Sequence, residues 1–103
     1  MRVTLETSGG FAAIPGLHPT ITIDSHDLAT VEAARLWRLV TDADFFALPA
    51  HVESGAAGGA DQRRYTLTVE DAAHQHTVTF TDPVENRALA AIRDYVIGHR
   101  AGE

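Results

Sequence analysis

The sequence predicts an α+β domain in which a four-stranded antiparallel sheet carries two helices on one face, in the order ββαββα. Two pairs of segments alternate apolar and polar residues with the period of two that a half-buried strand requires. These are residues 2–7 with 20–24, and residues 64–70 with 75–81. Each pair is followed by a segment of helical periodicity, residues 28–41 and 83–97. A length of 103 residues predicts one domain spanning residues 1–103.

The first hairpin has an unusual connection. Gly9-Gly10 supplies the positive φ angles of a tight turn, and the apolar run that follows is broken by Pro15-Gly16. This run matches ordinary core strands in neither period nor length. It therefore predicts either a packed hairpin tip or a surface that another protein grips.

The first predicted helix has an apolar stripe, and Asp27 or Ser25 is its expected N-cap. The stripe consists of Leu28, Ala29, Leu36, Leu39 and Val40. A short turn is expected next, with Asp44 as its cap and Pro49 as its end. Its side chains Phe45, Phe46 and Leu48 are expected to enter the core. Residues 50–62 then predict a long loop rich in glycine and alanine.

The second half repeats the scheme with a stronger helix signal. Its strands are expected to turn inward Tyr65, Leu67, Val69, Val78 and Phe80. Asp82, Pro83 and Glu85 then match a cap, a first-turn proline and the glutamate of a capping box. The buried stripe of this helix is Leu89, Ile92 and Val96, and Gly98 is its expected end. In this topology residues 9–18, the loop 50–62 and the Asp82-Pro83 turn share one end of the domain.

Composition excludes several classes of function. The chain has no cysteine, which excludes disulfides, thiol nucleophiles and thiolate metal sites. Its net charge is −6 and all of its basic residues are arginine, with no cluster larger than Arg63-Arg64, so nucleic-acid binding is not expected. No apolar run approaches the length of a membrane helix, and no signal peptide is recognisable at Met1, so we expect a cytoplasmic protein.

Residues that carry catalytic or metal chemistry are sparse. His74 and His76 point the same way on a strand, and His51 from the long loop is a possible third metal ligand. The alternative is that these histidines close a turn and line the sheet edge. Asp42 and Asp44 are explained by capping, and no setting activates a serine. We therefore expect no enzyme, no cofactor and no resident metal.

Several segments together resemble the emfourin family, the protein inhibitors of thermolysin-type metallopeptidases such as protealysin. The resemblance covers nearly the whole chain in order. Its most distinctive parts are Gly9-Gly10 with Ala12, and Ile14-Pro15-Gly16-Leu17. Its other parts are Asp27-Leu28 ahead of residues 32–36, residues 44–49, residues 65–71 and residues 76–80. The resemblance implies a small αβ protein, without catalysis or cofactor, that binds a zinc metallopeptidase and blocks its active-site cleft.

An inhibitor must present surface to a peptidase cleft without being cut, which rigid, proline-anchored loops achieve by preorganisation. We therefore expect the inhibitory interface at the two unusual loops. Its candidate residues are Gly9, Gly10, Phe11, Ile14, Pro15, Gly16, Leu17, His18, His51 and Glu53. For Phe11 and Ile14 the alternative is that they continue the core face of the second strand. The expected partner is a thermolysin-like metallopeptidase bound one-to-one by a monomer, and the alternative function is a protein-interaction module without inhibitory activity.

Overall fold

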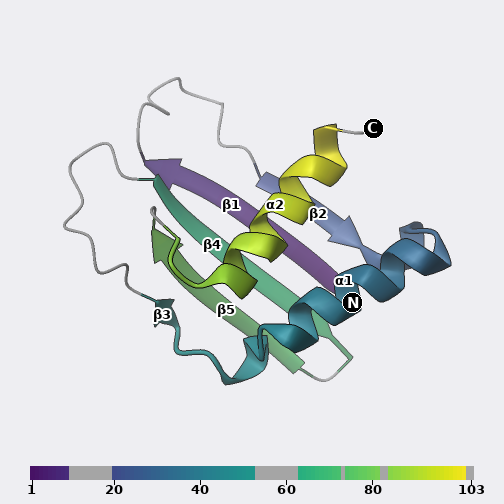
Figure 1. Ribbon diagram of the computed structural model, residues 1–103, viewed down its shortest axis with the longest axis horizontal. Coiled ribbons are helices and arrows are strands. Elements are labelled where there is room, and N and C mark those ends of the chain that lie inside the picture. Colours follow the sequence, from purple (N-terminus) through teal and green to yellow (C-terminus); the bar gives the residue numbers. More distant parts are fainter. Residues whose placement is uncertain (10–19, 53–62, 73, 82–83, 102–103) are drawn as a thin grey trace.

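The computed structural model describes residues 1–9, 20–52, 63–72, 74–81 and 84–101 of the chain. The strands and helices form an α+β fold, with one strand more than the expected order ββαββα (Figure 1). They are β1 (Arg2–Gly9), β2 (Thr20–Asp24), the 3-10 turn η1 (Ser25–Asp27), α1 (Thr30–Asp42), the 3-10 turn η2 (Phe45–Ala47), β3 (His51–Val52), β4 (Arg63–Asp71), β5 (His74–Thr81) and α2 (Arg87–Ala101).

The described strands form one mixed sheet of five, in the order β2-β1-β4-β5-β3. Four of them pair antiparallel as predicted, but β3 adds a fifth strand parallel to β5. The prediction of four antiparallel strands was wrong in this detail. A strand of two residues, His51–Val52, is too short to show an alternating pattern. Pairing with β5, not local sequence, holds it in place.

Both helices cover the same face of the sheet, as predicted (Figure 1). The predicted inward residues of β4 and β5 are all buried, and so are the three stripe residues of α2. Burial of each large aliphatic side chain contributes roughly 1.5–3 kcal/mol relative to exposure. The core consists of Val3, Leu5, Ile23, Leu36, Val40, Ala43, Phe45, Tyr65, Leu67, Val69, Val78, Phe80, Leu89, Ile92 and Val96.

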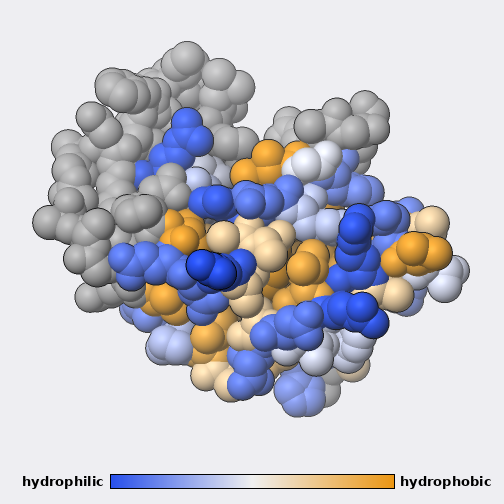
Figure 2. Space-filling view, in the orientation of Figure 1, coloured by the Kyte–Doolittle hydropathy of each residue, from blue (hydrophilic) through white to orange (hydrophobic). Residues whose placement is uncertain are grey.

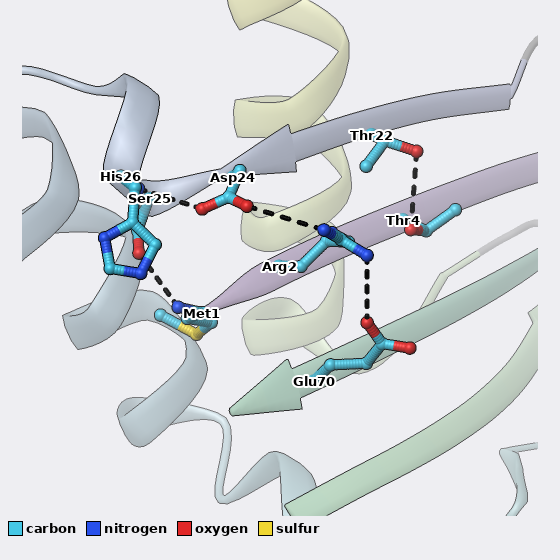
Figure 3. Close-up of polar contacts among 8 residues, drawn as sticks. All are labelled: Met1, Arg2, Thr4, Thr22, Asp24, Ser25, His26 and Glu70. Atoms are coloured by element: carbon cyan, nitrogen blue, oxygen red, sulfur yellow. Dashed lines mark hydrogen bonds and ion pairs between the residues drawn. The ribbon is translucent and has the colours of Figure 1, made fainter. Parts of the chain in front are cut away.

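The start of α1 differs from the prediction. Its N-cap position is Ala29, which has no side chain to cap with, and neither Asp27 nor Ser25 caps the helix. Both belong to η1, which ends too early to reach the first free N–H groups of α1. Ser25 Oγ instead accepts a hydrogen bond from the Met1 amino group at 2.9 Å (Figure 3). Asp24 caps η1, because its Oδ1 accepts from the His26 backbone N–H at 3.0 Å.

The turn after α1 is present, but two of its predicted roles were wrong. Asp44 makes no capping hydrogen bond with its side chain, since its backbone is left-handed with a φ of 50°. Phe45 is buried as expected, whereas Phe46 keeps 37% of its surface exposed. The turn ends at Ala47, and Leu48 packs against the edge of the core.

The start and the end of α2 also differ from the prediction. The cap is Asn86, whose Oδ1 accepts from the backbone N–H groups of Ala88 and Leu89 at 3.0 and 3.1 Å. Glu85 precedes this cap, so it closes no capping box, while Asp82 and Pro83 lie outside the described residues. The predicted end at Gly98 was wrong, because the helix continues to Ala101.

The face of the sheet opposite the helices is polar. Its cross-strand rows follow from the register: Thr22, Thr4, Thr68 and Thr77 form one row, and Asp24, Arg2, Glu70 and Gln75 form another. Arg2 reaches both Asp24 and Glu70 at 3.7 Å (Figure 3). Within the part of the chain that the structure describes, neither helix is long and apolar enough to cross a membrane.

Candidate functional site

Strand register brings the attachment points of the predicted loops to one end of the sheet. Gly9, the last residue of β1, pairs with Arg63, the first residue of β4. The next residue, Arg64, pairs with Thr81 at the end of β5. Residues 10–19, 53–62 and 82–83 therefore all join the described strands at this end, which lies at the left of the sheet in Figure 1. We call it the loop end.

Two of the ten predicted interface residues lie within the described residues. Gly9 belongs to strand β1, and His51 belongs to strand β3. The other eight lie outside the described residues: Gly10, Phe11, Ile14, Pro15, Gly16, Leu17, His18 and Glu53. Their interface role stays a prediction.

His51 is placed by a strand, whereas the sequence predicted a loop. It pairs with Thr79, whose side chain lies on the open face of the sheet, and its own side chain is exposed. From Gly9 to His51 the sheet advances by three strand spacings and about three residues along the strands, which is roughly 17 Å. Both residues therefore fit within one interface of ordinary size.

The loop end has an aromatic base that the sequence reading did not assign to a site. Tyr65 stacks on Phe80 with ring centroids 5.3 Å apart. The Arg93 guanidinium of α2 lies 5.2 Å from the Tyr65 ring centre, at cation–π distance. This packing fixes the ends of β4 and β5 to the helix above them. The sequence signal was limited to the inward alternation of Tyr65 and Phe80.

Positive charge is concentrated at the start of β4. Arg63 and Arg64 are both exposed there, in a chain whose net charge is −6. In sequence this pair is too small a basic cluster to predict nucleic-acid binding. At a protein interface, exposed arginines are suited to carboxylates of a partner, which they bind through two parallel hydrogen bonds.

The three histidines of the metal alternative do not converge. His76 Nε2 lies 2.7 Å from the carbonyl oxygen of Leu48, and its ring meets Phe45 edge-on at 5.6 Å. His74 meets Phe46 in the same way at 5.9 Å. His51 is on the opposite face of the sheet, with Thr79. Among the described residues no group of three or more His, Cys, Asp or Glu side chains is placed to hold a metal ion.

Two surface hollows in the described part lie away from the loop end. One, on the open face, is lined by Arg2, Thr4, Thr22, Asp24, Asp27 and Glu70. The other lies between α1 and η2 and is lined by Trp37, Val40, Thr41, Asp44, Phe45 and Phe46. On the helix side, hydrophilic and hydrophobic side chains are interspersed (Figure 2). The loop end is thus defined by the strand residues at which residues 10–19, 53–62 and 82–83 join the sheet and by the exposed Arg63 and Arg64, an arrangement suited to a macromolecular partner.

Comparison with known proteins gives a family match over most of the chain. Residues 5–96 match the family model described as emfourin. Among solved structures the chain is similar to emfourin from Serratia proteamaculans, described as an M4 family peptidase inhibitor. The two share 24% sequence identity and a TM-score of 0.39, over 94% of this chain and 87% of that one. No curated protein sequence matches this chain.

Proposed function

This chain belongs to the emfourin family, and on that premise we propose that it binds a thermolysin-like zinc metallopeptidase of the M4 family and blocks its active-site cleft. The match of residues 5–96 to the family model carries the proposal. Emfourins are peptidase inhibitors, not enzymes. The chain therefore acts by occupying a surface of its target, and the expected complex holds one chain per peptidase.

The geometry of the loop end supports this part of the molecule as the inhibitory surface. The segments 10–19 and 53–62 leave the sheet from residues that are directly paired, Gly9 and Arg63. A regular sheet below them, held by the Tyr65–Phe80 stack, limits the relative movement of their attachment points. Preorganisation of this kind reduces the entropy lost on binding, which favours a tight complex.

The strand ends also supply a favourable setting for polar contacts. Exposed Arg63 and Arg64 lie directly beside the attachment points, and His51 is about 17 Å away on the same sheet. In this proposal residues 10–18 enter the cleft, with Leu17 and His18, which follow Pro15-Gly16 in the sequence, as principal contacts. The arginines bind carboxylates on its rim.

The alternative is a protein-interaction module of the same fold without inhibitory activity, and a titration separates the two. Purified chain is added to thermolysin, and to an M4 peptidase from the same organism, while hydrolysis of a peptide substrate is followed. The proposal predicts a loss of activity that saturates near one chain per peptidase. A serine peptidase serves as the control and stays active. Full activity of every M4 peptidase at a large excess of chain would favour the interaction module.

A further inference from the structure

Among the strands that the structure describes, β2 forms one edge of the sheet. Its five residues pair regularly with β1 on one side, and no described strand lies on the other (Figure 1). Natural edge strands carry charged side chains, above all lysine, or proline or a bulge, are covered by a helix or loop, or are very short, because unpaired backbone groups recruit another strand. The segment Thr-Ile-Thr-Ile-Asp has no lysine, proline or bulge, and its one charged residue, Asp24, stands at its end, where it is paired with Arg2. By contrast, β3 at the opposite edge has only two residues.

The sequence of β2 is self-complementary about its central residue, Thr22. In an antiparallel pair of two β2 strands centred there, Thr22 faces Thr22, Ile21 faces Ile23, and Thr20 faces Asp24. We propose that β2 pairs with β2 of a second copy of this chain in this register, joining two five-stranded sheets into one. The inference is independent of the proposed inhibitory function.

In this register the two copies place their apolar side chains on one face of the joined sheet and their threonines on the other. Ile21 and Ile23 are on the helix side, because their partners in β1 are the buried Leu5 and Val3. Ile21 is only half-buried in the single chain, so a neighbouring copy adds apolar cover to it. On the open face, the row of threonines that ends at Thr22 continues into the row of the second copy.

The charges of β2 are also compatible with a second copy of β2 as its partner. The Asp24 carboxylate is bound to Arg2 at 3.7 Å, and in the proposed register it faces an uncharged threonine, not another carboxylate. Like charges directly opposite each other would oppose pairing. No such pair occurs between two copies of β2.

An interface built on five residues from each copy is small, so the expected association is weak and depends on concentration. The monomer expected from the sequence is then the dilute species. Sedimentation equilibrium of the full chain over roughly a hundred-fold range of concentration tests this. We expect the average mass to rise from one chain toward two. A single-chain mass throughout the range would overturn the inference.

Two substitutions test the register with opposite expected effects. Thr22→Lys places two lysines opposite each other at the centre and is expected to raise the dimer dissociation constant about 2–5-fold. Thr20→Arg places a cation between Glu6 of its own chain and Asp24 of the second copy. It creates two equivalent ion pairs and is expected to lower the dissociation constant several-fold. Thr68→Lys is the control, since it alters the same row of the open face in the central strand β4.

Amide chemical shifts identify which surface associates. The inference predicts concentration-dependent shifts centred on the amides of Thr20–Asp24, with the effect reduced in Thr22→Lys and unchanged in Thr68→Lys. Dimerisation with shifts centred instead on Trp37 and Phe46, the exposed apolar side chains beside η2, would overturn the proposed strand pairing. Circular dichroism of each variant establishes that it is folded.

Discussion

Gly9 and Arg63 are direct partners in the antiparallel pairing of β1 with β4, although they are far apart in the sequence. One proposed inhibitory segment follows Gly9, and the other precedes Arg63. Their attachment points are thus held at the spacing of two adjacent strands, roughly 4.8 Å. The same end of the sheet therefore carries the attachment points of both segments, which is why we propose the inhibitory surface there.

The segment after Gly9 is tested by the double substitution Leu17→Asp with His18→Ala. Loss of an apolar anchor and introduction of a charge are expected to raise the inhibition constant toward an M4 peptidase at least about tenfold. Val31→Asp is the matched control, because it makes the same kind of change at a residue of α1 that is 78% exposed. Inhibition by the control is expected to equal that of the wild type, and an unchanged constant for the double variant would contradict our placement of the contacts.

A hydrogen bond between α1 and α2 predicts that stability falls at alkaline pH. The Tyr95 hydroxyl donates to Glu32 Oε2 at 2.9 Å, and partial burial together with this hydrogen bond raises the pKa of Tyr95 to about 12. The unfolded phenol ionises near pH 10, so the unfolded state gains stability first as the pH rises. The contribution of Tyr95 to the free energy of unfolding is therefore constant below about pH 10 and falls between about pH 10 and 12.

Tyr95→Phe isolates this effect. The chain has no lysine and no cysteine, so few other groups titrate in that range. We expect the variant to lose less stability than the wild type between about pH 10 and 12 in urea unfolding at each pH. Equal losses in the two proteins would show that the Tyr95–Glu32 contact does not cause the fall in the free energy of unfolding at alkaline pH.

The N-terminus of α2 offers a comparison between its observed cap, Asn86, and Glu85, the predicted glutamate of a capping box. Asn86→Ala removes the acceptor for two backbone N–H groups and is expected to cost about 1 kcal/mol of stability. Glu85→Ala alters the exposed residue that the sequence pattern had favoured and is expected to change stability by less than about 0.5 kcal/mol. Thermal unfolding of both variants measures the difference. A larger loss for Glu85→Ala would restore the earlier start predicted for the helix.

His76 and His74 make contacts of different kinds. His76 bonds the Leu48 carbonyl at 2.7 Å and is half-buried, so His76→Ala leaves this acceptor unsatisfied and is expected to cost about 1–3 kcal/mol. His74 is exposed and has its ring contact with Phe46, so His74→Ala is expected to cost less than about 0.5 kcal/mol. Urea unfolding compares them, and equal losses would mean that the hydrogen bond to Leu48 contributes little.

The fold was largely predictable because burial repeats with the period of each element. Leu67 and Val69 alternate with polar neighbours, and Leu89, Ile92 and Val96 fall on one side of a helix, so one-face packing could be read directly. Helix boundaries were harder. The predicted caps Asp27 and Asp82 have the chemistry of a cap, but α1 begins after Ala29, which has no capping side chain, and the cap of α2 is Asn86.

The candidate site was only partly predictable for a related reason. The unusual composition of residues 9–18 singled out the first segment without any structure. The fifth strand at His51–Val52 and the Tyr65–Phe80–Arg93 stack depend on contacts between distant parts of the chain, which leave no local pattern. The proposed class of target likewise rests on the family match, not on any catalytic or ligand-binding motif.

Amide hydrogen exchange of the chain, alone and bound to an M4 peptidase that it inhibits, tests the proposed inhibitory surface most directly. We predict that binding slows exchange in residues 10–18 and at Arg63 and Arg64, with little change around Trp37 and Phe46. Protection confined to α1 and η2, with residues 10–18 and the start of β4 unchanged, would contradict the assignment of inhibition to the loop end.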